Sequence, residues 1–447
     1  MIRSLTIKRF YHSLRVLGIE TSCDDTAAAV VDSNRTIISQ VCRNQFKYHQ
    51  PWGGIVPNIA KNHHYANLVP VVAEVMKDIE WNTIAAIATS IKPGLVISLW
   101  QGIKFTRQLL EKYTHLSFIP IHHMEAHALT VRLTHDVPFP YMVLLASGGH
   151  CILAIVEDID KFYRLGETQD IAPGEAFDKS ARELKLHKHP LVENMVGGAA
   201  IGYLAREGDE KRYQLITSKY SAKMRDCSFS FGGMLSRIRR VIAKGGLYSE
   251  SSNVDEQKLK DFSACIQSSI VRHIETRVHR AILFCDAVQK PQWKRRLVLS
   301  GGVASNLYLR QCINDLCTHY GVELFCPPVE FCTDNGVMIA WNGIERYRQN
   351  MNVFERMSDT LVPEGRAPLG SDISEQVRAC NISVPFEWKN EHGTDSALLY
   401  HITWYQEKLF RSIKKLNCIH SSLLKNYVEN LSSLQHFYPA SILDKLM

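Results

Sequence analysis

The same order of strand-like and helix-like segments occurs twice along the chain. Residues 16–42 contain three strand-length runs, VLGIETS, TAAAVVDS and TIISQVC, and the triplet returns from Tyr141 as YMVLLAS, CILAIVED and FYRLGE. Downstream of each triplet come an apolar strand, a glycine-containing loop and a helix-like segment. These are IAAIATS, IKPG and LVISLWQGIKFTRQLL in the first half, and RRLVLS, GG and VASNLYLRQCI in the second. The duplication predicts two similar α/β domains that face each other across a cleft.

The repeat sets the expected domain boundaries. Because 447 residues exceed what one ordinary core needs, we expect a first domain over residues 17–135 and a second over residues 136–330. The second copy is longer because a helical insert lies near residues 175–290. A helix within residues 331–360 is expected to return to the first domain. No role follows for residues 361–447, although their stretch LLYHITWYQEKLFRSIKKL is typical of a helix.

The first sixteen residues, MIRSLTIKRFYHSLRV, carry four cations and no acid. Such a start is typical of a mitochondrial transit peptide, so residues 1–16 are predicted as a leader and the mitochondrial matrix as the location. The alternative is a short basic tail. Because these cations account for much of the net charge of +7, that charge does not by itself indicate a nucleic-acid partner.

The composition indicates neither membrane insertion nor a structural cysteine site. No apolar run approaches the roughly eighteen residues that are needed to cross a bilayer. With 45% apolar and 22% charged residues, the chain has a globular composition. Its twelve cysteines are scattered without a CxxC pair, so we expect them to be reduced and mostly buried.

Two glycine turns occupy matching places in the repeat. SGGH, Ser147 to His150, follows the strand-like run at Tyr141, and SGGV, Ser300 to Val303, follows the run RRLVLS. The backbone N–H groups of such turns can approach a phosphate because no Cβ is in the way. Each turn alone is better explained as a tight strand connection, but their symmetric placement favours a nucleotide held between the two halves. The sequence contains neither the Walker nor the Rossmann glycine pattern.

The segment HHMEAH contains two histidines, His123 and His127, four positions apart. On a helix this spacing places both side chains on one face, close enough to share a metal. The intervening Glu125 does not stand where a zincin or an inverzincin needs its glutamate, and the deaminase pattern P-C-x-x-C is absent. The spacing is equally compatible with two ordinary helical histidines. A third ligand has to come from a distant segment, and the candidate is Asp334 in FCTDNGVMIA, whose alternative role is to cap the helix that follows.

Three further groups of polar residues have two interpretations each. Asp24 and Asp25 in TSCDDT face a phosphate-bound metal or fill a hairpin turn, and the turn is slightly favoured. Asp178 in GEAFDKSARELK binds a ribose or caps a helix. The basic run at residues 237–244 is a solvated helix face, which is the commoner case, or part of an RNA-binding surface.

Taken together, these motifs resemble those of one family. The matching pieces, in family order, are GIETSCDDT, GGIVP, KPGL, HHMEAH, SGGH, GEAFDK, the pair Gly197–Gly198, SFSFGG, SGGVASN and CTDNGVMIAWNGIE, which cover about residues 17–350. Each motif alone is weakly specific, whereas the ordered set is highly specific. The chain resembles the tRNA N6-adenosine threonylcarbamoyltransferase family, and most closely its mitochondrial branch.

The resemblance implies a fold and a site. The fold is α/β, with duplicated actin/Hsp70/sugar-kinase-like (ribonuclease-H-like) domains that face a nucleotide cleft. One divalent metal cation per subunit is held by His123, His127 and Asp334, a ligand set that suits zinc or iron(II). The adenylate half of the substrate contacts a set of residues from the second half of the chain: Ala146, Ser147, Gly148, Gly149, His150, Asp178, Gly198 and Asn306.

The resemblance also implies a reaction and partners. A threonylcarbamoyl group passes from threonylcarbamoyl-adenylate to N6 of the adenosine 3′ of the anticodon, in mitochondrial tRNAs that read codons beginning with A, and AMP is released. The partners are tRNA, a separate synthase that makes the adenylate, and a second copy of the chain in a homodimer. The rival functions are a metalloprotease, an ATPase or kinase on the same fold, and a non-catalytic scaffold.

The chain departs from the family pattern at three positions. Lys92 stands where a glycine usually precedes Pro-Gly, and Ala199 replaces a common proline. Gly202 stands where several members carry an acid near the nucleotide, which puts one ribose contact in doubt. We expect Glu125 to point away from the shared face of the two histidines and at most to orient one of them as a hydrogen-bond acceptor.

Overall fold

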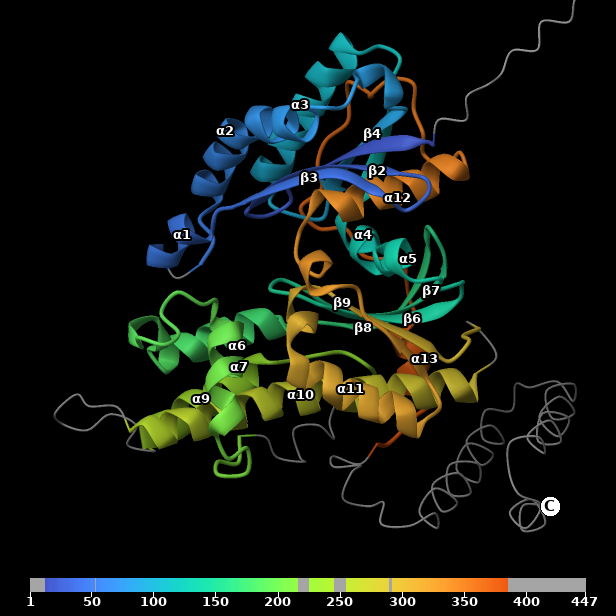
Figure 1. The fold of residues 1–447 in the computed structure, drawn as a ribbon. Coiled ribbons are helices and arrows are strands. Elements are labelled where there is room, and N and C mark those ends of the chain that lie inside the picture. Colours follow the sequence, from blue (N-terminus) through green and yellow to red (C-terminus); the bar gives the residue numbers. More distant parts are fainter. Residues whose placement is uncertain (1–12, 53, 216–224, 245–254, 289–291, 385–447) are drawn as a thin grey trace, which may run out of the picture.

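Two sheets with the same strand order form the framework of the computed structural model (Figure 1). The first sheet has the order β3-β2-β1-β4-β5. Read in the same direction, the second sheet has the order β11-β8-β7-β6-β9-β10, which is the same succession with one additional edge strand, β11. In each sheet the central strand, β1 or β6, pairs antiparallel with the next strand and parallel with a strand reached through helices. This repeated topology confirms the predicted duplicated actin/Hsp70/sugar-kinase-like α/β fold. The structure describes residues 13–52, 54–215, 225–244, 255–288 and 292–384.

The first domain is a sheet with helices on both faces. Its strands are β1 (Arg15–Glu20), β2 (Asp25–Asp32), β3 (Ile37–Asn44), β4 (Ala86–Lys92) and β5 (Ser117–His122). One face packs against α2 (Pro57–Val75) and α3 (Val96–Lys112), and the other packs against α12 (Gly336–Arg348). Shorter helices follow β3, α2 and β5: α1 (Phe46–His49), η1 (Gln50–Trp52), η2 (Trp81–Thr83), α4 (His123–Leu129) and α5 (Val131–Thr134).

The apolar strands β1 and β2 are buried on both faces because helices cover both. Leu17 and Ile19 point toward α2, whereas Val16 points toward α12. Helix α12 approaches β1 so closely that a Cβ built on Gly18 would lie 2.3 Å from the backbone nitrogen of Ala340. Glycine at this position therefore permits the late helix to complete the core of the early sheet.

The second domain carries the long helical insert. Its strands are β6 (Tyr141–Ala146), β7 (Cys151–Asp158), β8 (Lys161–Glu167), β9 (Arg296–Ser300), β10 (Glu323–Phe325) and β11 (Ser371–Asp372). Its helices are α6 (Pro173–Glu183), η3 (Leu186–Lys188), α7 (Gly197–Leu204), η4 (Ala205–Glu207), α9 (Gly232–Lys244), α10 (Glu256–Ala287), η5 (Gly302–Ser305), α11 (Leu307–His319), η6 (Val329–Phe331) and α13 (Ser374–Ala379). Helix α10 forms the centre of this domain, because most of its residues are buried.

Helix α4 lies between the two sheets (Figure 1). It packs against α12 of the first domain, and its residues Met124 and Ala128 belong to a core cluster that also contains β6 and β7. Two side chains of the second domain donate hydrogen bonds to its carbonyl groups: Tyr141 Oη to Ala128 at 3.0 Å and Ser300 Oγ to His127 at 3.0 Å. The helix that carries both histidines is thus held from both sides.

Residues 351–382 run from the first domain to the second. Phe354 exchanges two backbone hydrogen bonds with Phe118 on β5, at 2.7 and 2.9 Å. Glu364 pairs with Lys92 at 3.0 Å, and farther along β11 joins the edge of the second sheet beside β8. The part of the predicted extension that the structure describes therefore packs on both domains.

The two chain ends bear on the predicted boundaries. Strand β1 begins at Arg15, two residues inside the stretch that was assigned to the leader, and most of that stretch (residues 1–12) lies outside the described residues. The helix-like stretch in residues 398–416 also lies outside them. Within the part of the chain that the structure describes, no helix has the length and apolar character to cross a membrane.

The contact between Gly18 and α12 generates a stability prediction. Gly18→Ala should lower the free energy of unfolding by about 3 kcal/mol, because the added methyl group overlaps the backbone of α12. Thermal unfolding followed by circular dichroism measures the loss. Gly54→Ala is the matched control, since a Cβ there meets nothing within 4 Å. Equal unfolding temperatures for the two variants would contradict this account of the core.

Candidate metal centre

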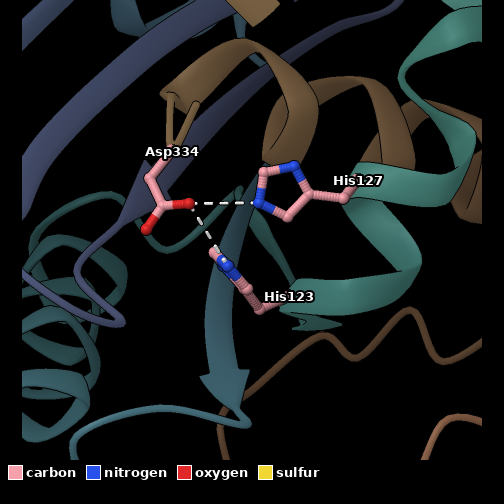
Figure 2. A group of neighbouring side chains, drawn as sticks. All are labelled: His123, His127 and Asp334. Carbon is pink, nitrogen blue, oxygen red and sulfur yellow. Dashed lines mark hydrogen bonds and ion pairs between the residues drawn. The ribbon is translucent and has the colours of Figure 1, made fainter. Parts of the chain in front are cut away.

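His123, His127 and Asp334 come together between the two domains (Figure 2). The Oδ1 atom of Asp334 lies 3.1 Å from His127 Nε2 and 3.4 Å from His123 Nε2. The candidate ligand atoms all lie within 4.8 Å of one another. This spacing suits a cation that binds each ligand at about 2.0–2.2 Å. The three residues that the sequence proposed as metal ligands are therefore neighbours in space.

The two alternative roles of these residues do not fit the structure. Asp334 does not cap α12, because Asn335 accepts the hydrogen bond from the backbone N–H of Met338 at 2.8 Å. The histidines are not two independent helical side chains either, since both direct Nε2 at the same carboxylate oxygen (Figure 2). The three side chains thus form a group whose ligand atoms could hold a metal ion.

Glu20 orients one of the histidines. Its side chain is fully buried, and its Oε2 atom lies 3.1 Å from His123 Nδ1. Ser22 Oγ lies 3.1 Å from the same nitrogen, and the backbone N–H of Ser22 donates to the other carboxylate oxygen of Glu20. When Nδ1 donates its hydrogen to Glu20, Nε2 presents a lone pair toward Asp334. A carboxylate behind a histidine in this way is the usual support for a metal ligand.

Glu125 points away from the two histidines, as expected, and orients neither of them. Its carboxylate forms an ion pair with Arg346 on α12, and both side chains are largely buried. Glu125 lies two positions from each histidine, so the helix points it to another side, as expected. The sequence signal for Glu20 was weak, because it belongs to a strand about one hundred residues earlier.

The electrostatics of the cluster favour a cation. Burial opposes the ionisation of His123, but Asp334 and Glu20 outweigh it and raise the pKa of His123 well above its ordinary value. Burial likewise opposes the ionisation of Asp334, and the adjacent His123 and His127 instead hold its pKa well below the usual range. The carboxylates of Glu20 and Asp334 thus strongly stabilise positive charge between them. A divalent cation could provide this charge if both imidazoles were neutral.

Asp24 and Asp25 add negative charge to the same region. Burial, together with the charges of Asp334 and Asp24, raises the pKa of Asp25 to about 8. Burial and the charge of Asp334 also raise the pKa of Asp24. Asp25 accepts a hydrogen bond from Asn44 Nδ2 at 2.6 Å. The two residues stand where β1 connects to β2, as the turn interpretation expects, and their charges also act on the candidate metal ligand Asp334.

The SGGH turn connects β6 to β7 beside this centre. Ala146 ends β6, and the backbone N–H of Ser147 donates to the carbonyl of His150 at 2.8 Å. A Cβ on Gly148 or Gly149 would meet no atom within 4 Å, so both glycines border open space. The turn is consistent with a place where a ligand can approach the backbone.

The remaining predicted nucleotide residues lie on helices of the second domain. Asp178 is inside α6 and does not cap it; its carboxylate accepts the backbone N–H groups of Gly197 and Gly198 at the start of α7. Asn306 caps α11 by accepting the N–H of Leu309 at 3.0 Å. Its Nδ2 donates to Gln267 at 2.9 Å.

Gln267 is a candidate that the sequence did not single out. It is buried on α10, and its Oε1 atom would lie 3.3 Å from a Cβ built on Gly202. Position 202, where several family members carry an acid, therefore lies beside the side-chain amide of Gln267, which is hydrogen-bonded to Asn306. No motif pointed to it, because it is one polar residue in a long buried helix.

Comparison with known proteins decides the family. The family model for tRNA N6-adenosine threonylcarbamoyltransferase matches residues 36–341. The mitochondrial tRNA N6-adenosine threonylcarbamoyltransferase of Rattus norvegicus is 44% identical over 389 residues, which cover 84% of this chain and 91% of that one. The chain belongs to the tRNA N6-adenosine threonylcarbamoyltransferase family.

Two other members of this family are similar to the chain over a comparable length. The mitochondrial protein of Homo sapiens is 43% identical over 383 residues, covering 84% of this chain and 91% of the relative. The tRNA N6-adenosine threonylcarbamoyltransferase of Orientia tsutsugamushi is 40% identical over 359 residues, covering 79% of this chain and 98% of the relative. The match thus extends over almost the full length of these family members, and the mitochondrial names agree with the predicted location.

The contact between Glu20 and His123 predicts a graded effect on metal affinity. Glu20→Gln keeps an acceptor for Nδ1 but removes its charge, and Glu20→Ala removes both. We expect metal affinity to fall by about tenfold for Glu20→Gln and further for Glu20→Ala, because such supporting residues typically contribute 10- to 100-fold. Competition with a chromophoric chelator measures the affinity directly. Equal affinities for the three proteins would show that Glu20 does not support the site.

Proposed function

We propose that this chain transfers the threonylcarbamoyl group of threonylcarbamoyl-adenylate to N6 of an adenosine in tRNA. The acceptor is the adenosine 3′ of the anticodon in mitochondrial tRNAs that read codons beginning with A, and the second product is AMP. Family membership supports the reaction class. The single observation that carries the site is the convergence of His123, His127 and Asp334 between two domains.

We further propose that these three residues hold one divalent cation per subunit, with zinc or iron(II) best suited to two imidazoles and one carboxylate. Three protein ligands leave coordination positions open, as in catalytic sites. When bound, such a cation stabilises negative charge that develops on the carbamoyl and phosphate oxygens. Glu20 orients His123 before the cation arrives, so little rearrangement is needed on binding.

The second domain is proposed to bind the adenylate. Within the stretch from Ala146 to His150, Gly148 and Gly149 border open space and are assigned to offer backbone N–H groups to the phosphate. Asp178, Gly198 and Asn306 are assigned to the nucleoside. Asp178 and Gly198 already contact each other, which supports their assignment to one part of the site.

The chemistry requires positioning more than a reactive side chain. The substrate is a mixed anhydride, so N6 of the adenosine attacks the carbamoyl carbon directly. The new N–C bond forms, the C–O bond to the phosphate breaks, and AMP leaves with the bonding electrons. The proton lost from N6 passes to a carboxylate or phosphate of the substrates. We therefore assign no protein nucleophile.

The metalloprotease alternative has less support. A metalloprotease needs a carboxylate that activates water at the metal. The only carboxylate within HHMEAH, Glu125, is paired with Arg346 and does not contact the histidines. An ATPase or kinase on the same fold does not require the two-histidine cluster, so the cluster favours the transferase.

Two further partners complete the proposal. A separate synthase supplies the adenylate in the mitochondrial matrix, and two copies of the chain form a homodimer. Helix α2 supports the dimer, because Tyr65 and Val69 lie one turn apart and are 77% and 62% exposed. Large apolar side chains grouped in this way on a surface helix are typical of an interface.

Reconstitution tests the function. Protein, threonylcarbamoyl-adenylate and unmodified tRNA should yield threonylcarbamoyladenosine, detected by nucleoside mass spectrometry. Asp334→Asn should lose bound metal and at least about 100-fold in transfer rate, since the isosteric amide is a poor ligand. Asp136→Asn, at a 93% exposed position, is the matched control. No modified nucleoside with any divalent metal would refute the proposal.

The dimer has its own test. Light scattering should give a mass of two chains for the natural sequence and of one chain for the double variant Tyr65→Lys, Val69→Lys. The charged side chains should disrupt an apolar contact without affecting the fold, because both positions face solvent in the single chain. A natural protein that is monomeric and fully active would contradict the dimer.

A further inference from the structure

A polar contact links the two domains at the start of η1. Gln50 Nε2 donates to the carbonyl of Glu193 at 3.2 Å. Gln50 belongs to the first domain, whereas Glu193 lies between η3 and α7 of the second. In Figure 1, α1, which leads directly into η1, extends toward the second-domain helices α6 and α7. Two short segments from different domains are therefore adjacent here.

Both segments expose large apolar side chains. Trp52 is 70% exposed in the first segment, and Leu191, Met195 and Val196 are 61%, 37% and 51% exposed in the second. We call these four residues the interdomain patch. Apolar side chains that gather at one place on a surface are typical of a binding site.

Buried neighbouring residues hold both segments of the patch in place. Val192 and His189 are buried, and His189 Nε2 lies 3.1 Å from Glu256 at the start of α10. In the first segment, the backbone N–H of Val56 donates to the buried His49 Nδ1 at 3.2 Å, which closes the loop that carries Trp52. The exposed side chains are thus presented from anchored segments.

Strand β3 connects the candidate metal centre to the patch. Cys42 Sγ lies 4.0 Å from the carbonyl oxygen of Asp334, and Asn44 Nδ2 donates to Asp25 at 2.6 Å. Helices α1 and η1 follow β3 directly and end at Trp52. A substrate whose reacting base reaches the centre can therefore extend its neighbouring nucleotides along this segment toward the patch.

The chemistry of the two segments fits RNA. Residues 46–56 and 185–196 together contain three lysines and one glutamate, besides exposed aromatic and apolar side chains. Lys47 Nζ lies 4.9 Å from the ring centroid of the half-exposed Tyr48. Aromatic platforms flanked by cations are the usual surface for unpaired nucleotides, which stack their bases and direct phosphates to the charges.

We infer that the interdomain patch binds unpaired nucleotides next to the adenosine that is modified, with Trp52 as the stacking platform. The inference rests on the proposed function and names the surface that receives the RNA loop. Because its two segments belong to different domains, a bound loop contacts both domains at once.

Binding of a labelled anticodon stem-loop RNA tests the inference. Trp52→Ala should weaken binding by about tenfold or more, whereas Trp52→Phe, which keeps an aromatic face, should retain most of the affinity. Leu191→Ser should cause a smaller loss. Phe354→Ala is the matched control, because this 46% exposed aromatic residue pairs with Phe118 of β5 in the same domain, outside the patch. Affinity for AMP and for an RNA duplex of equal length should be unchanged in every variant.

The outcomes separate the inference from the proposed function. If Trp52→Ala binds the stem-loop as tightly as the natural sequence, the patch is not an RNA surface and the inference falls. If Trp52→Ala changes the mass in solution and leaves RNA binding intact, the patch is a protein interface, which also overturns it. If the natural protein binds the stem-loop no better than the duplex and transfers nothing to tRNA, the proposed function itself fails.

Discussion

The burial of α4 between two sheets is the constraint on which the site depends. This helix packs against α12 on one side and against β6 and β7 on the other, and hydrogen bonds from Tyr141 and Ser300 fix its carbonyl groups. His123 and His127 therefore have little freedom, and Asp334 reaches them from the loop that precedes α12. A shift of either domain relative to α4 would change the spacing of the three side chains.

The electrostatics of this region link folding to cation binding. Glu20 is fully buried, Asp334 is enclosed by the two imidazoles, and burial raises the pKa of both Asp24 and Asp25. Desolvated carboxylates are costly unless positive charge compensates them. A cation that binds only the folded state lowers this cost and stabilises the fold by mass action. The same acids that prepare the centre for a metal thus make the empty centre electrostatically unfavourable.

The sequence predicted those features that come from a recurring pattern. It did not predict most contacts between segments that are far apart in the chain. The duplicated succession of strands and helices was read from the repeat, and His123, His127 and Asp334 followed from spacing together with family motifs. The ion pair of Glu125 with Arg346 was not predicted, because helical spacing gives the direction of a side chain but not the residue that lies opposite. Glu20 and Gln267 had no local signal, since their roles arise from neighbours far away in the chain. The packing of residues 351–382 on both domains was likewise invisible, because short irregular segments carry no period.

Helix α12 also determines the order in which the molecule can be assembled. The first sheet is complete at His122, yet the face around Gly18 stays uncovered until residues 336–348 arrive. A chain that enters the matrix from its N-terminus therefore delivers the first sheet early and its covering helix late. Strands β6 to β10 of the second domain lie between Tyr141 and Phe325, so they are all delivered before this covering helix. The domain that enters first thus keeps an apolar face uncovered while most of the second domain follows it.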